Sequence, residues 1–108
     1  MAGYGLDLRI SLRWRRVPVP MEKIRLAAEE LRSFGAKRVL LFGSYAHDPA
    51  QARDVDLAEE GIPLERLGMA DLAVYRVLNT PFDLISREED PQFFELVSRK
   101  AVTLYEQG

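Results

Sequence analysis

The sequence predicts an α/β (α+β) fold: a small mixed β-sheet with helices packed on one face. Three observations lead to this class. The short apolar run Val39–Phe42 stops at a Gly-Ser pair, as a buried strand does at a tight turn. The segments 21–34 and about 64–78 repeat apolar residues with helical period. Strand-type and helix-type segments follow one another as β, α, β, β, α, β, α, with a short extended piece at the end. We treat residues 1–108 as a single domain, with a core over 20–108.

Residues 1–19 form an extension that precedes this core. From Leu6 to Trp14 apolar and polar residues alternate without error, which predicts a half-buried strand. The prolines at 18 and 20 end it, because proline has no N–H to give to a ladder. This additional strand could add to the edge of the sheet within the subunit or pair with a second copy of the chain, which would make a homo-oligomer.

The helices carry recognisable end signals. Pro20 suits the first turn of the helix from Met21, and Gly35 suits the position just after its end. The next helix opens after Gly61 and runs to about Leu78. The last helix has two candidate starts, a capping box over 86–89 and an Asp-Pro pair at 90–91.

A pair of aspartates stands on the strand candidate 53–58. Because side chains alternate faces along a strand, Asp54 and Asp56 point the same way. Two carboxylates that close repel, and each raises the pKa of the other unless a cation lies between them. A hard divalent ion with oxygen ligands, Mg²⁺ or Mn²⁺, resolves that repulsion. A solvent-exposed strand face is the alternative.

Two further features bear on this pair. Gly43 and Ser44 form a turn just upstream, where converging backbone N–H groups and a short helical turn could receive an anion. Asp83 is a lone charge on the short strand candidate 80–86, so three carboxylates meet if the two strands are neighbours. An anion cradle beside carboxylates is what a metal–triphosphate complex requires.

The Gly-Ser pair, the D-x-D pair nine residues later, a helix and then a strand with Asp83 resemble the minimal nucleotidyltransferases. These are small members of the DNA polymerase beta-like superfamily, and they are often antitoxin partners of HEPN-domain toxins. The resemblance runs from about Met21 to Tyr105. It includes the segments DVDLAEEGIP and PFDLIS and the closing VTLYE.

The resemblance implies a nucleotidyltransferase fold and specific roles for five residues. Gly43 and Ser44 would bind the nucleotide phosphates. Asp54 and Asp56 would hold the divalent metal, Mg²⁺ or Mn²⁺. Asp83 would complete the metal site and help to activate the attacking hydroxyl. The implied reaction transfers a nucleotidyl group from ATP or another nucleoside triphosphate to a hydroxyl of a HEPN-type partner protein, and with ATP as the donor the group is AMP. With no room in 108 residues for an acceptor-binding domain, we expect the acceptor on another molecule.

The chain departs from the family pattern at one point. Members often continue the Gly-Ser pair as x-Ala-Arg-Gly, whereas this sequence has Tyr45, Ala46, His47 and Asp48. A domain that neutralises its partner toxin by binding alone is therefore the alternative function. His47 could contact phosphate or lie at the surface, and Tyr45 could stack near the base or pack in the core.

Charge and hydropathy argue against nucleic acids and membranes as partners. Residues 39–108 carry six basic and thirteen acidic side chains, whereas residues 1–38 carry nine and four. An acidic body does not suit general nucleic-acid binding, which requires a basic face. No apolar run approaches the roughly 18 residues of a transmembrane helix, and no secretory signal is evident, so we expect a cytoplasmic protein. Cysteine is absent, which excludes disulfides and thiolate metal sites.

Overall fold

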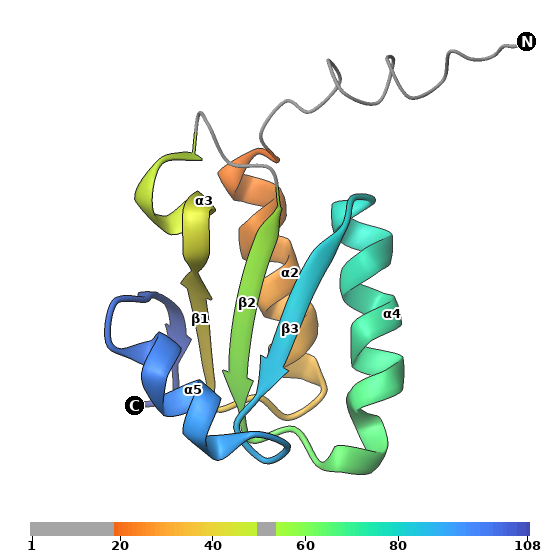
Figure 1. Cartoon of the computed structure of the whole chain (residues 1–108). Coiled ribbons are helices and arrows are strands. Elements are labelled where there is room, and N and C mark those ends of the chain that lie inside the picture. Colours follow the sequence, from red (N-terminus) through yellow and green to blue (C-terminus); the bar gives the residue numbers. More distant parts are fainter. Residues whose placement is uncertain (1–18, 50–53) are drawn as a thin grey trace, which may run out of the picture.

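The computed structural model describes residues 19–49 and 54–108 (Figure 1). The strand expected over Leu6–Trp14 lies outside these residues, and its role stays a prediction. The described elements alternate in the expected order. The helices are α2 (Met21–Ser33), α3 (Gly43–His47), the 3₁₀ turn η2 (Leu64–Arg66), α4 (Leu67–Leu78) and α5 (Pro91–Ser98), and the strands are β1 (Arg38–Phe42), β2 (Val55–Glu60), β3 (Phe82–Ser86) and β4 (Val102–Glu106).

The four strands form one mixed sheet in the order β3-β2-β1-β4. β1 lies antiparallel to β2 and to β4, and β2 lies parallel to β3. The parallel pair is possible because α4 returns the chain to the starting edge of the sheet between β2 and β3. The short extended piece expected at the end of the chain is the edge strand β4, which pairs with β1.

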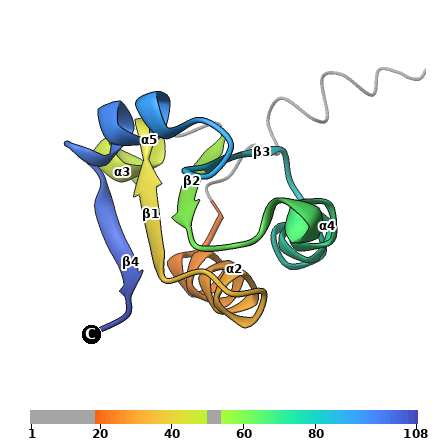
Figure 2. The same cartoon turned by 90° about the horizontal axis from the view of Figure 1, so that it is seen from below.

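The main core lies between the sheet and two helices. α2 and α4 pack side by side on one face of the sheet (Figures 1 and 2), so the prediction that the helices share one face holds for these two helices and not for α5. Their fully buried side chains include Ile24 and Leu31 from α2 and Val74 from α4, which meet Val39 and Leu57 of the central strands.

α5 lies on the opposite face of the sheet from α2 and α4 (Figure 2). A smaller apolar cluster fixes it there, in which Phe94 packs against Leu40 of β1 and Ala58 of β2. Of the two candidate starts for this helix, the chain uses the second. The Asp90 carboxylate accepts a hydrogen bond from the Phe93 N–H at 3.1 Å, and Pro91 occupies the first turn.

In the part of the chain that the structure describes, every helix is too short or too polar to span a lipid bilayer.

Candidate functional site

The site begins where β1 ends and the chain turns into α3. Gly43 follows Phe42 with a φ of +74°, in the left-handed region that favours glycine. A Cβ added at Gly43 would lie 2.1 Å from Oδ2 of Asp56, because Phe42 is the register partner of Asp56 on β2. The turn therefore brings the backbone of Gly43 directly against the Asp56 carboxylate, and only glycine leaves the space. Ser44 is exposed in the first turn of α3.

Asp56 and Asp83 are neighbours across the parallel pair of β2 and β3. They are direct register partners. Each stands two positions before a residue that packs with Phe94 of α5, namely Ala58 on β2 and Ile85 on β3, and residues two positions apart on a strand share a face. Both carboxylates therefore lie on the face opposite the α2–α4 layer. The pKa of Asp56 is raised to about 6 by four causes together, which are, from the largest to the smallest, burial, the charge of Asp83, a hydrogen bond with Asp83 and the charge of Asp54.

Asp54 is exposed and lies just before β2, next to residues 50–53, which the structure does not describe. It acts on Asp56 through its charge, whereas Asp83 also forms a hydrogen bond with it. Over residues 19–49 and 54–108, no three histidine, aspartate or glutamate side chains are already arranged to hold a metal ion. The Asp56–Asp83 pair is thus formed, and the three-carboxylate site stays a prediction.

The donor chemistry of this pair fits a hard divalent cation. Asp56 and Asp83 offer only oxygen atoms, and the groups that shift the pKa of Asp56 are all carboxylates, with no lysine or arginine among them. A cation bound between the two carboxylates would offset the burial and the repulsion that raise the pKa of Asp56.

The residues after Ser44 divide between core and surface. Tyr45 is buried, and its hydroxyl donates a hydrogen bond to the carbonyl of Val19 just before α2, so it packs rather than stacks on a base. His47 is exposed at the end of α3.

His47 lines a cavity of about 400 Å³ between α3, the end of β1 and the C-terminal end of α5. Gly43 borders it too, so the cavity lies next to the carboxylate pair. The other lining residues are Phe42, Leu96, Val97, Arg99 and Lys100. Sequence reasoning missed the contribution of α5. The available signal was the adjacent basic pair Arg99 and Lys100, which stands out in an acidic half of the chain.

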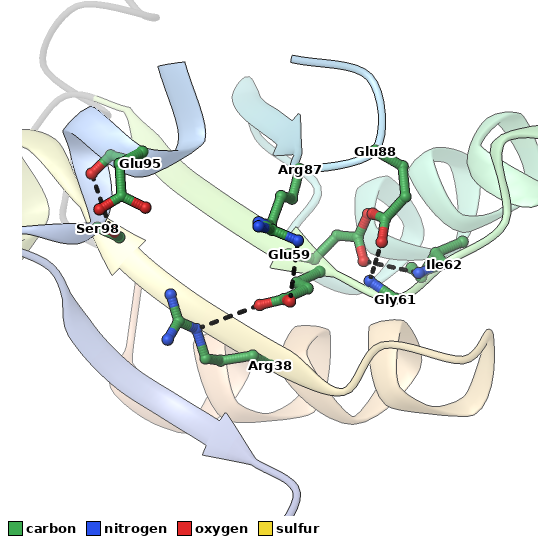
Figure 3. Close-up of polar contacts among 9 residues, drawn as sticks. Arg38, Glu59, Gly61, Ile62, Arg87, Glu88, Glu95 and Ser98 are labelled. Atoms are coloured by element: carbon green, nitrogen blue, oxygen red, sulfur yellow. Dashed lines mark hydrogen bonds and ion pairs between the residues drawn. The ribbon is translucent and has the colours of Figure 1, made fainter. Parts of the chain in front are cut away.

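A second acidic cluster occupies the far end of β2 and β3 (Figure 3). Glu59 is fully buried, and its Oε1 accepts a hydrogen bond from the Ile62 N–H at 3.0 Å. Glu88 accepts from the Gly61 N–H at 3.0 Å, and Arg38 and Arg87 both pair with Glu60. Burial raises the pKa of Glu59, and Ser86 and the Ile62 N–H partly offset that rise. Sequence reasoning also missed Glu59, although it shares the buried face of β2 with Val55 and Leu57.

No protein-family model matches the chain, and no curated protein matches it. Among solved structures, one described as a minimal nucleotidyltransferase is 30% identical in sequence. The match covers 93% of this chain and 98% of that one, with a TM-score of 0.55. The chain belongs to the minimal nucleotidyltransferases.

Two other solved structures that are similar to the present chain are chains from mutants of a toxin–antitoxin complex, MntA-HpeT. The first has a TM-score of 0.63 at 19% identity and the second 0.61 at 14%, and the matches cover 82% and 79% of this chain and 73% of each of those chains. At these identities the likeness shows the fold alone. In the second mutant, glutamate replaces two aspartates that stand two positions apart in its sequence.

Proposed function

We propose that this minimal nucleotidyltransferase transfers AMP from ATP to a hydroxyl of a partner protein in a Mg²⁺-dependent reaction, as the antitoxin of a HEPN-type toxin. The observation that carries the proposal is the contact between Gly43 and Asp56, with Asp83 as the register partner of Asp56. The glycine turn lies directly against the Asp56 carboxylate, whose pKa burial and the neighbouring Asp83 raise. A turn that could bind phosphate and two carboxylates that could hold a cation at the same end of the sheet support binding of a nucleoside triphosphate there.

Asp56 and Asp83, with Asp54 beside them, would hold the Mg²⁺ or Mn²⁺. Bound there, the cation neutralises charge on the triphosphate and on the attacking and leaving oxygens. Gly43 and Ser44 position the phosphates at the start of α3. Asp83 accepts the proton of the acceptor hydroxyl and passes it to solvent. The hydroxyl oxygen forms a bond to the α-phosphorus, the bond from that phosphorus to the bridging oxygen breaks, and pyrophosphate leaves.

The acceptor comes from another protein in this proposal. Two structural relatives are chains of a toxin–antitoxin complex, which supports a toxin as the partner. The replacement of a D-x-D pair in one of those mutants supports the choice of Asp54 and Asp56 as the residues to change first.

A second candidate function is neutralisation of the toxin by contact alone. Asp48, an exposed acid that ends α3 close to the turn, favours it, because a negative charge there opposes binding of a triphosphate.

The two candidates separate in a transfer assay with α-labelled ATP, Mg²⁺ and a HEPN-type partner protein. The enzyme moves label to the partner. Asp56→Asn abolishes that transfer, whereas the control Asp71→Asn, which removes an exposed carboxylate from α4 on the other face, does not. If the toxin is inhibited with no label transferred and no Mg²⁺-dependent affinity for ATP, the contact mechanism replaces the enzymatic one. Transfer retained by Asp56→Asn would refute the assignment of the carboxylates.

A further inference from the structure

The cavity between α3 and α5 shares one wall with the carboxylate pair. Gly43 lines it, and the missing side chain of Gly43 faces the Asp56 carboxylate on the other side. Gly43 therefore borders both the Asp56 carboxylate and the cavity, so the two lie next to each other. The volume, about 400 Å³, lies within the range of about 300–1,000 Å³ of small-molecule sites.

The charge of this cavity is opposite to that of the region around it. Residues 39–108 carry more than twice as many acidic as basic side chains, yet Arg99, Lys100 and His47 all line the same cavity. Within residues 19–49 and 54–108, Arg99 and Lys100 form no ion pair.

Two other arginines of residues 39–108 have structural partners. Arg87 pairs with Glu60, and Arg66 donates a hydrogen bond to the Phe34 carbonyl at 3.0 Å. The two cations at the end of α5 are thus available to an anion.

We infer that this cavity binds the β- and γ-phosphates of the nucleoside triphosphate, with Arg99 and Lys100 as their cationic contacts. The inference rests on the proposed function and adds to it the group that receives the leaving pyrophosphate. An arginine fork binds phosphate oxygens in pairs, and a lysine adds a compact positive charge. Phe42, Leu96 and Val97 form an apolar wall that cannot hydrate the anion, which strengthens its attraction to the two cations.

The chemistry explains why cations belong at this position. When the bond between the α-phosphorus and its bridging oxygen breaks, the electron pair remains on that oxygen and the pyrophosphate leaves with the added negative charge. Asp83 and solvent take the proton of the acceptor hydroxyl, so no further reactant is needed. Arg99 and Lys100 stabilise the charge on the leaving group, opposite to the acidic side that holds the cation.

The test is calorimetric titration of the full chain with ATP, AMP and inorganic pyrophosphate in the presence of Mg²⁺. The variant Arg99→Gln/Lys100→Gln removes both charges from exposed side chains, so the fold is retained. The matched control, Lys23→Gln/Arg76→Gln, removes two exposed cations from α2 and α4 on the other face. We expect the first variant to bind ATP and pyrophosphate about tenfold or more weakly, to bind AMP within about twofold of the unmodified chain, and the control to match the unmodified chain.

Asp56→Asn, titrated in parallel, separates this inference from the proposed function. If Asp56→Asn abolishes Mg²⁺-dependent ATP binding while Arg99→Gln/Lys100→Gln changes nothing, the cavity assignment is wrong and the proposed function stands. If the double variant loses pyrophosphate binding while Asp56→Asn keeps full ATP binding, the cavity assignment holds and the carboxylate site is wrong. Equal losses for AMP and ATP in the double variant would overturn the inference, because the cavity would then hold the nucleoside end. Absence of pyrophosphate and ATP binding to the unmodified chain would overturn it too.

Discussion

Asp56 and Glu59 stand three residues apart on the same strand, and burial raises the pKa of both, yet their surroundings differ. Asp56 faces the α5 side, where the groups that act on it are the carboxylates of Asp83 and Asp54 and where the backbone of Gly43 lies against it. Glu59 faces the α2–α4 side, where the Ile62 N–H donates to it.

The difference separates a structural acid from a functional one. Glu59 ties the turn after β2 to the core, because its carboxylate accepts a backbone N–H that would otherwise be buried without a partner. For Asp56, burial and the charges of its carboxylate neighbours raise the pKa, so its ionised form makes the folded protein less stable. Repulsion of that kind, kept on an otherwise well-packed strand, is typical of residues that serve a ligand. A raised pKa alone would not distinguish the two acids.

The largest effect is expected at Gly43. The change Gly43→Ala places a methyl group on the Asp56 carboxylate, so the side chain must move. We expect Mg²⁺-dependent transfer to fall by at least about 100-fold, as for loss of a positioned charge contact. The control Gly35→Ala has a similar backbone strain, at a φ of +119°, but meets only Pro63 at 3.6 Å and the Gly61 carbonyl at 3.8 Å. It should lower the free energy of unfolding by about 1–2 kcal/mol with transfer retained. Equal activity losses in both variants would mean that Gly43 acts through stability.

The next effect concerns the pH dependence of the metal-free protein. The pKa of Asp56 is raised to about 6 in the folded state from an ordinary 3.8, so the folded state binds more protons between these values. The free energy of unfolding therefore falls as pH rises from about 4 to about 6. Asp56→Asn should flatten this slope in thermal unfolding. Above pH 6, Mg²⁺ at ten times its dissociation constant should restore about 1.4 kcal/mol. A slope that Asp56→Asn leaves unchanged would contradict the assignment.

A smaller effect is expected at Glu59, whose raised pKa has the same sign. The folded state keeps the Glu59 proton to higher pH than the unfolded state, so ionisation costs stability as pH rises. Glu59→Gln keeps an oxygen for the Ile62 N–H and removes the charge. Near neutral pH it should raise the free energy of unfolding by about 1 kcal/mol and leave nucleotide transfer unchanged. Chemical denaturation at several pH values measures the first, and loss of transfer would show that Glu59 serves the site.

The smallest effect is expected at Gly68, which serves as a comparison for the substitutions at Gly43 and Gly35. Gly68 lies in the first turn of α4 with nothing within 4 Å of an added Cβ. Gly68→Ala should therefore raise the free energy of unfolding by up to about 1 kcal/mol through helix propensity, with no change in activity. Destabilisation would show that the surroundings of α4 are tighter than the structure indicates.

The sequence predicted the elements because their signals are local. Alternation, helical period and the Asp90–Pro91 cap depend on residues close along the chain. The Gly43 turn and the D-x-D pair were also visible in the sequence. Their resemblance to the minimal nucleotidyltransferases predicted the family, and the comparison with solved structures confirms it. The adjacency of Asp56 and Asp83 needed the register of β2 with β3, which α4 sets across about 20 residues. Prediction of the cavity would have required knowing how α5 packs through Phe94. The adjacent basic residues Arg99 and Lys100 are visible in the sequence, but their position near Gly43 depends on that packing.

The most direct measurement is an amide NMR titration of the chain with ATP and substoichiometric Mn²⁺, which broadens signals near the bound ion. The account predicts that the amides of Gly43, Asp56 and Asp83 broaden first, while those of Gly61 and Ile62 beside the Glu59 cluster keep their intensity. Asp56→Asn should remove the effect. Broadening that starts at the Glu59 end, or that spreads evenly over the sheet, would contradict the placement of the site.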